Sequence, residues 1–244
     1  MDEMKHPSPK IKELLRTSIL PALWERAPYA SVPVVRGALS NAGAQSQPAT
    51  VNRYLHSLLQ AGEVFDAGRG WYSRLATPFA LNRKPVSGLV NELITAFPLL
   101  DFSCWSTGQV ASYGHHLLAK FVVFVNTERD SMESVVEALR KTGWTAYLHP
   151  TRLEAAKSFR QEDKTAVVRP SISRAPVDGK FATIEKILVD LYAETAALRL
   201  MDAGEYRQIV INLAGHERIS VAALAQYAQR RGFTLEAVLP GIIN

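Results

Sequence analysis

The first 75 residues contain three short segments in which apolar residues recur every three or four positions, followed by two short β-type segments. These patterns predict three amphipathic helices and then a β-hairpin. The predicted helices span about residues 9–27, 31–41 and 48–61, and the hairpin pairs residues 64–66 with 71–73 across Gly68-Arg69-Gly70. Three short helices that must share one core, closed by a hairpin, occur in this order in a winged helix-turn-helix.

Positive charge is concentrated in this same part of the chain. Residues 1–90 hold eleven Lys and Arg against six Asp and Glu, a net charge of +5, whereas residues 91–244 hold seventeen of each. Clustered basic side chains are the electrostatic footprint of a surface that binds nucleic acid. The charge therefore supports a DNA-binding use of the predicted fold, although a slightly basic solvated surface is the alternative that charge alone leaves open.

The third predicted helix is expected to enter the major groove, because its apolar stripe faces the core and leaves its polar face free. Asn, Gln and Arg read base edges, whereas Thr, His and Lys more often hold phosphates. Basic residues at the hairpin and in the first helix would add phosphate contacts. The expected DNA contacts are Gln47, Thr50, Asn52, Arg53, His56, Arg69, Arg74, Lys10 and Lys12. A winged helix used only to dock another protein is the alternative.

Residues 77–88 contain two prolines and no apolar stripe, so they predict a linker between a first domain, residues 1–76, and a second domain, residues 89–244. Strands are predicted at residues 101–105, 116–125, 145–148 and 166–169, with helices at 89–96, 106–113 and 130–141. From Thr183 onward only helical stripes remain. The predicted fold class is α+β: an N-terminal winged helix-turn-helix, then a mixed α/β domain with a helical C-terminal part.

Motifs of catalysis are missing from the sequence. It has no phosphate-binding loop, dinucleotide-binding glycine pattern, zinc-protease helix or nucleophile elbow, so we expect no enzyme activity, cofactor or metal. The neighbours His115 and His116 would point to opposite faces of a strand, which disfavours a metal site. Cys104, the single cysteine, excludes an internal disulfide and is expected to be a small buried residue rather than a nucleophile.

One enzyme class stays open as an alternative. A restriction-type nuclease uses an Asp and a Glu-x-Lys sequence on adjacent strands to bind a divalent metal ion. The chain offers Asp101 and Glu185-Lys186, but the second pair lacks the intervening residue and falls on a predicted helix.

The start of the chain is polar, and the longest apolar run, residues 117–125, is too short to cross a bilayer and is interrupted by Lys120. We therefore expect a cytoplasmic protein without a membrane partner.

Several short segments match a known family. They are Ala96-Phe97-Pro98, Trp105-Ser106-Thr107, His115-His116, the run from Phe121 to Val125, and KFATIEKILVDLYAE from Lys180 to Glu194. In these segments, and in the order of its two predicted domains, the chain resembles the AbiEi-like antitoxins of the type IV (AbiE) toxin–antitoxin systems. The stretch TIEKILVD, residues 183–190, is the most specific of the matches.

This resemblance implies a transcriptional repressor of its own operon, which binds double-stranded promoter DNA and counteracts a nucleotidyltransferase toxin in phage defence. It brings no catalytic residues. Glu185, Lys186 and Asp190 lie in the most specific match, where helical spacing allows either a structural role or a solvated face. The alternative function is a winged-helix regulator whose second domain binds a ligand or a protein, with no toxin partner.

Overall fold

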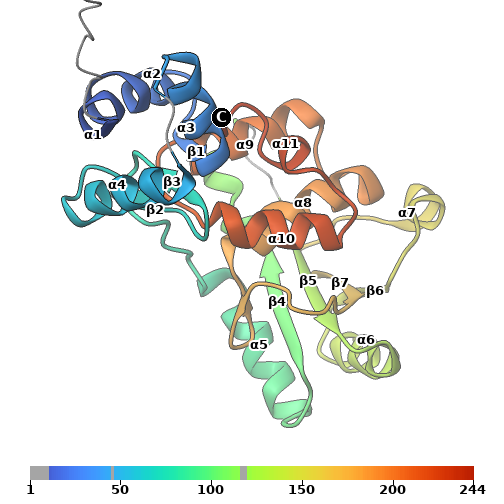
Figure 1. The fold of residues 1–244 in the computed structure, drawn as a ribbon. Helices are drawn as coiled ribbons and strands as arrows, with labels where there is room; N and C mark the ends of the chain where they lie inside the picture. The colour runs from blue at the N-terminus through green and yellow to red at the C-terminus, as the bar shows by residue number, and fades with distance from the viewer. Residues whose placement is uncertain (1–10, 45–46, 116–119) are drawn as a thin grey trace, which may run out of the picture.

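The structure is a computed structural model that describes residues 11–44, 47–115 and 120–244 (Figure 1). The first part of the chain holds α1 (Ile11–Leu14), the π-helical turn η1 (Leu15–Ile19), α2 (Leu20–Trp24), β1 (Tyr29–Ser31), α3 (Val32–Asn41), α4 (Pro48–Gln60), β2 (Phe65–Asp66) and β3 (Trp71–Ser73). The sheet of the second part holds β4 (Phe102–Ser106), β5 (Val122–Thr127), β6 (Thr145–Leu148), β7 (Thr165–Pro170), β8 (Val177–Asp178) and β9 (Phe181–Ala182).

The helices of the second part fall into two groups along the chain. Between residues 84 and 158 lie α5 (Lys84–Ala96), α6 (Met132–Lys141), α7 (Arg152–Ser158) and the 3-10 turns η2 (Thr107–Gln109), η3 (Ala111–Tyr113) and η4 (Arg129–Ser131). After the last strand come α8 (Ile184–Leu198), α9 (Ala203–Ala214), α10 (Val221–Arg230) and α11 (Leu235–Val238). The protein is therefore a mixed α+β protein with a helical C-terminal part.

The first helical segment runs through Pro21 without a break. A proline inside a helix lacks an N–H and clashes with the carbonyl four residues earlier. Here the turn before it is π-helical, with the Leu20 N–H bonded to the Leu15 carbonyl, and this wider turn makes room for the ring. Leu15, Ile19 and Leu23 consequently stay on one buried face.

The remaining elements of the first part close around the same core. Ser31 ends β1 and caps α3, since its Oγ accepts from the Val34 N–H at 3.4 Å. The hairpin β2–β3 gains β1 as a third, antiparallel strand, in the order β1-β3-β2. A single apolar cluster joins α2, α3 and α4.

The larger sheet has the strand order β6-β7-β5-β4-β9-β8. Strands β5, β6 and β7 are parallel, and β4 runs antiparallel to β5. Side chains alternate between the two faces of each strand. Helices α5 and α6 cover one face, packing on Cys104 and Val125, and α8 covers the other, packing on Trp105 and Phe124.

The face of the sheet covered by α8 changes character toward one end. Trp105 and Phe124 are paired across β4 and β5, and their rings stack with centroids 4.2 Å apart. Two positions along, the same face carries a polar row, in which Ser103 pairs with Asn126 and Asn126 pairs with Arg169. All three residues of this row are buried.

The C-terminal helices also contact the first part. The Tyr29 hydroxyl donates to the Glu217 carbonyl and accepts from the Ile219 N–H, both at 3.0 Å. The Asn244 side chain donates to backbone carbonyls at the end of α2 and in β1. The chain end consequently lies beside β1 and α3, far in sequence but close in space (Figure 1).

The predicted helices and strands are largely confirmed, with corrections. The helix predicted at residues 106–113 is instead the two 3-10 turns η2 and η3. The predicted linker 77–88 is wrong in its second half, because α5 begins at Lys84 and uses Pro85 in its first turn, where a proline stabilises the helix. Phe79 and Leu81 also pack on the core, so this stretch is not a free linker. The strand predicted at 116–125 is shifted: β5 starts at Val122, and residues 116–119, including His116, lie outside the described residues.

Four short elements escaped prediction: β1, α7, β8 and β9. Each spans at most seven residues, too few for a periodic pattern to stand out. Across the described ranges, no helix combines the length and apolar character needed to cross a membrane.

Candidate nucleic-acid interface

Helix α4 lies at the left edge of the molecule in Figure 1, and its sequence gives it one apolar and one polar face. Val51, Leu55 and Leu58 are fully buried against α3 and the first helical segment. Asn52, Arg53 and His56 are exposed between these buried positions, because 3.6 residues per turn separates the two sets by about half a turn. The buried stripe therefore holds α4 rigidly while its polar face meets solvent.

The hairpin places a basic residue next to that face. Gly68 and Gly70 have φ of +94° and +80°, a backbone conformation that glycine adopts without strain, and Arg69 is held between them at the tip. Two hydrogen bonds fix the conformation of the tip. The Gly68 N–H donates to Asp66 Oδ1 at 3.1 Å, and the Val32 N–H donates to the Gly70 carbonyl at 3.0 Å.

Helix and hairpin together enclose a shallow hollow of about 440 Å³. It is lined by Asn52 and His56 from α4, Arg69 and Gly70 from the hairpin tip, Tyr72 from β3 and Val32 from α3. Three of the residues predicted to contact DNA thus share one concave surface.

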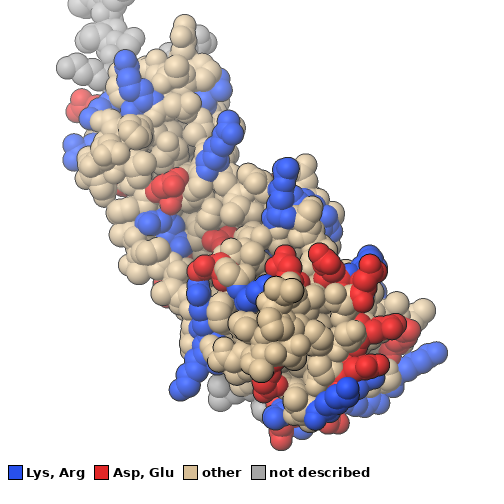
Figure 2. All heavy atoms as spheres, turned by 90° about the horizontal axis from the view of Figure 1, so that it is seen from below, with Lys and Arg blue, Asp and Glu red and all other residues tan. Residues whose placement is uncertain are grey.

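The two arginines of α4 and the hairpin tip, Arg53 and Arg69, are not paired with carboxylates. Among the residues that the structure describes, neither Arg53 nor Arg69 forms an ion pair, and Arg53 instead lies over the ring of Tyr54 with its guanidinium carbon 5.2 Å from the centroid. Burial, with the Asp66 carboxylate nearby, raises the pKa of Tyr72, so its hydroxyl stays neutral. In Figure 2, acidic side chains are sparse at the upper-left end, which belongs to the first part, and gather over the opposite end.

The other predicted contact residues are less closely grouped. Lys12 lies beside α4, with its Nζ donating to Ser57 Oγ at 2.9 Å. Gln47 is exposed directly before α4, and Thr50 is half-buried in its first turn. Arg74 is exposed at the end of β3 away from the Gly68–Gly70 turn, and Lys10 lies outside the described residues.

Tyr72 and Val32 were not among the predicted contacts, although both line the hollow. The alternation along Trp71-Tyr72-Ser73 was the available signal for Tyr72, since neighbouring strand residues point to opposite sides. Val32 had no such signal, because its place at the hollow depends on how α3 packs against the hairpin.

The charged residues of the most specific sequence match are buried rather than solvated. Lys186 is 1% exposed, Asp190 3% and Glu185 9%. The Lys186 ammonium forms an ion pair with Asp190 and donates to Asn126 Oδ1 at 2.9 Å, and Asp190 accepts from the Tyr227 hydroxyl at 2.8 Å. A solvated face is therefore wrong for this segment, and a structural role is what the contacts show.

Asp101, Glu185 and Lys186, the residues considered for a nuclease, do not come together in one metal-binding site. Asp101 and Lys186 line one pocket, but the Glu185 carboxylate is absent from that pocket and accepts from the Ser220 N–H at 2.8 Å. Within the described ranges, no group of three or more His, Cys, Asp or Glu side chains is placed to hold a metal ion. Cys104 is completely buried in the core, as expected.

A model of a protein family described as a family of unknown function (DUF6577) matches residues 50–238. The matched stretch begins in α4 and ends with α11, so it contains the polar face of α4, the hairpin and the whole larger sheet. No curated protein matches the chain.

Proposed function

Since the chain belongs to this family of unknown function (DUF6577), we propose from its own geometry that it binds double-stranded DNA through a winged helix formed by its first part. The observation that carries the proposal is the hollow in which Asn52 and His56 of α4 face Arg69 of the hairpin tip. In this proposal α4 is the recognition helix and the β2–β3 hairpin is the wing.

The chemistry of the exposed side chains supports a nucleic-acid partner over a protein partner. Asn and Arg read base edges through paired hydrogen bonds, and a free guanidinium neutralises phosphate. Arg53 and Arg69 have no carboxylate partner among the described residues, which leaves both available for an anionic ligand.

Binding to the DNA upstream of the protein's own gene tests the proposal. We expect a labelled duplex from that region to bind in fluorescence anisotropy, and the affinity to fall steeply as salt rises from about 50 to 200 mM, because phosphate contacts release counterions. Arg69→Ala and Arg53→Ala should each weaken binding. Arg129→Ala removes an exposed guanidinium from the second part and should leave binding unchanged.

Two results would reject the DNA-binding role. One is the absence of binding at low salt to any duplex tested. The other is binding that neither Arg53→Ala nor Arg69→Ala weakens relative to Arg129→Ala, which would move the contact surface away from α4.

We propose further that the DNA-binding protein is an autorepressor and the antitoxin of a nucleotidyltransferase toxin, on the strength of the resemblance to AbiEi-like antitoxins. The most specific matching segment lies in the core, since residues 184–190 form the buried start of α8, so this match bears on the fold that the two would share rather than on a contact with a toxin. Co-expression with a neighbouring nucleotidyltransferase gene should relieve growth arrest. Continued arrest would reject the antitoxin role and leave DNA binding intact.

A regulator without a toxin, whose second domain binds a ligand, is the second candidate. It is favoured by a polar pocket at the end of the larger sheet.

A further inference from the structure

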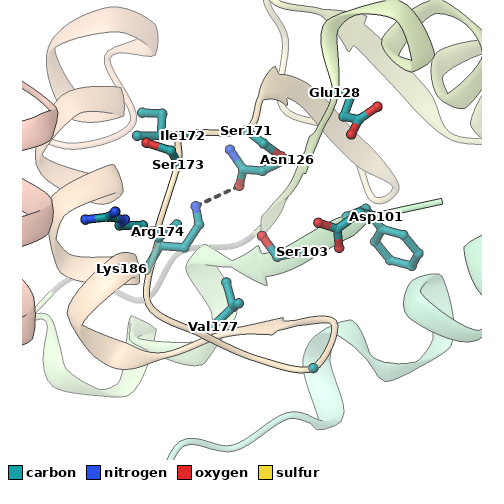
Figure 3. Close-up of a pocket in the computed structure, with 13 residues that line it drawn as sticks. Asp101, Ser103, Asn126, Glu128, Ser171, Ile172, Ser173, Arg174, Val177 and Lys186 are labelled. Atoms are coloured by element: carbon teal, nitrogen blue, oxygen red, sulfur yellow. Dashed lines mark hydrogen bonds between the residues drawn. The ribbon is translucent and has the colours of Figure 1, made fainter.

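A pocket of about 330 Å³ lies between the larger sheet, the start of α8 and the loop that follows β7 (Figure 3). Its inner wall is formed by Ser103 and Asn126, neighbours in the polar row of the sheet, and by Lys186 from α8. Asn126 lies near the carboxyl end of β5, and the loop leaves the carboxyl end of the parallel strand β7. Ligands of open α/β sheets bind at this edge of parallel strands.

Two mostly buried residues of the inner wall each carry a polar group that has no partner among the described residues and reaches the open space of the pocket. Ser103 is 7% exposed and Asn126 4%. Asn126 Oδ1 accepts from Lys186 Nζ, the bond dashed in Figure 3, whereas the Asn126 amide nitrogen and the Ser103 hydroxyl have no hydrogen bond within the described part of the chain. Both groups can donate a hydrogen bond into the pocket, so together they suit a ligand that supplies acceptors.

Charge is divided across the pocket. Lys186 and Arg174 lie on one side, and the carboxylates of Asp101 and Glu128 lie on the other (Figure 3). Asp101 is paired with Lys180, whose Nζ lies 3.5 Å from Asp101 Oδ1, whereas Glu128 forms no ion pair within the described residues. Behind Lys186, Asp190 is shared with a second cation, Arg231, whose Nη1 lies 3.5 Å from Asp190 Oδ1. Two cations around one buried carboxylate leave this side with a positive excess.

We propose that the pocket binds a free α-amino acid. Its carboxylate would accept hydrogen bonds from Lys186, the Asn126 amide and Ser103, and its ammonium group would face Asp101 and Glu128. The distribution of donors and charge favours a small zwitterion over a simple anion, which the unpaired Glu128 carboxylate would repel, and over a simple cation, which Lys186 would repel. A volume of about 330 Å³ suits a molecule of this size. The proposal does not depend on DNA binding.

Titration calorimetry of the full chain with each of the twenty L-α-amino acids tests the inference. At least one should bind, and its N-acetyl derivative and its methyl ester, which each lack one of the two charges, should bind more weakly. Ser103→Ala should weaken binding about tenfold, because one hydrogen bond to a charged group is lost. Since the Ser103 hydroxyl has no partner in the protein, this variant is expected to fold normally.

Two further variants sharpen the result. Asp101→Asn neutralises a side chain that is 93% exposed. Its pair with Lys180 is at the surface and is expected to contribute less than about 1 kcal/mol to stability, so the variant should weaken binding and still fold. Thr195→Val is the matched control: it removes a hydroxyl that also has no partner among the described residues, on α8 but outside this pocket, and should leave binding unchanged.

Three outcomes would overturn the inference: none of the twenty amino acids binds, Ser103→Ala binds as tightly as the parent, or the N-acetyl derivative binds as tightly as the free amino acid. A chain that binds an amino acid but no DNA would retain this inference and lose the proposed function.

Discussion

Lys186 is a long cationic side chain with 1% of its surface exposed, and its surroundings explain how the protein tolerates it. An isolated buried charge is costly, and the cost is offset only by a partner and by further hydrogen bonds. Lys186 has Asp190 four residues along α8, the Asn126 oxygen and the ring of Tyr227, whose centroid lies 5.5 Å from Nζ. Residues 183–190, the segment that most specifically matches the AbiEi-like family, thus contribute Lys186 and Asp190 to a buried ionic network that joins α8 to the sheet and to α10.

Removing one partner of this network should be severely destabilising. Asp190→Asn leaves the Lys186 and Arg231 cations without their shared carboxylate, and we expect a loss of about 3–5 kcal/mol in the free energy of unfolding. Urea denaturation at neutral pH measures it. Asp163→Asn is the control, because Asp163 is 93% exposed and 3.8 Å from Lys120, a pair expected to contribute less than about 1 kcal/mol. Equal losses for the two variants would contradict the network's role.

Cys104 is expected to be unreactive in the folded protein. Burial raises the pKa of its thiol well above the ordinary range, and only the thiolate attacks a disulfide reagent. Ellman's reagent should therefore modify no thiol in the native protein and one thiol per chain in concentrated guanidinium chloride. Rapid modification of the native protein would show that the sheet opens around β4, or that Cys104 is an activated nucleophile.

At the scale of elements, α4 buries one face in the core and exposes the opposite face to solvent. Leu55 is fully buried between α3 and the first helical segment, whereas Asn52 lies on the exposed face. The exposed side chains keep a fixed geometry only as long as the buried ones anchor the helix.

Emptying one core position of α4 should therefore cost stability, whereas trimming its exposed face should not. We expect Leu55→Ala to lower the free energy of unfolding by about 2–5 kcal/mol, and Asn52→Ala to change it by less than about 0.5 kcal/mol. Chemical denaturation of the two variants measures the difference. A Leu55→Ala protein as stable as the parent would show that the buried stripe of α4 is assigned wrongly.

At the scale of the whole molecule, α10 of the C-terminal part packs directly against the β2–β3 hairpin of the first part. The Ala222 N–H of α10 donates to the Ala67 carbonyl at 3.3 Å, and a Cβ on Gly68 would lie 2.6 Å from the Ala222 Cβ. The hairpin that carries Arg69 is thus positioned by Ala222, which lies 154 positions after Gly68 in the chain, and the two parts are not independent units joined by a free linker.

Gly68→Ala and Gly70→Ala test this contact as a matched pair. Both glycines have positive φ, so both substitutions add backbone strain, but an added Cβ meets α10 only at Gly68 and open space at Gly70. We expect Gly68→Ala to lose about 1–3 kcal/mol more than Gly70→Ala, the range typical of overpacking. Faster hydrogen exchange at the Ala222 amide in Gly68→Ala alone would place the damage at this contact. Equal losses of stability in the two variants would show that the contact between Gly68 and α10 does not position the hairpin.

The sequence by itself determined most of the local structure. Apolar stripes predicted α3, α4, α6 and the helices after Thr183, and Gly68-Arg69-Gly70 predicted the hairpin turn, because these features depend on residues close together in the chain. The same patterns predicted the exposed face of α4, and so Asn52, Arg53 and His56 as surface residues.

Only the tertiary structure decided which of those residues meet. The hollow shared by Asn52, His56 and Arg69 depends on how α3, α4 and the hairpin pack, and the pocket of Ser103, Asn126 and Lys186 depends on the register of β4 against β5 and on α8 lying across both. Helical spacing allowed Lys186 a solvated position. Its burial follows from partners that lie on other elements, and no local pattern records a contact between segments 60 residues apart.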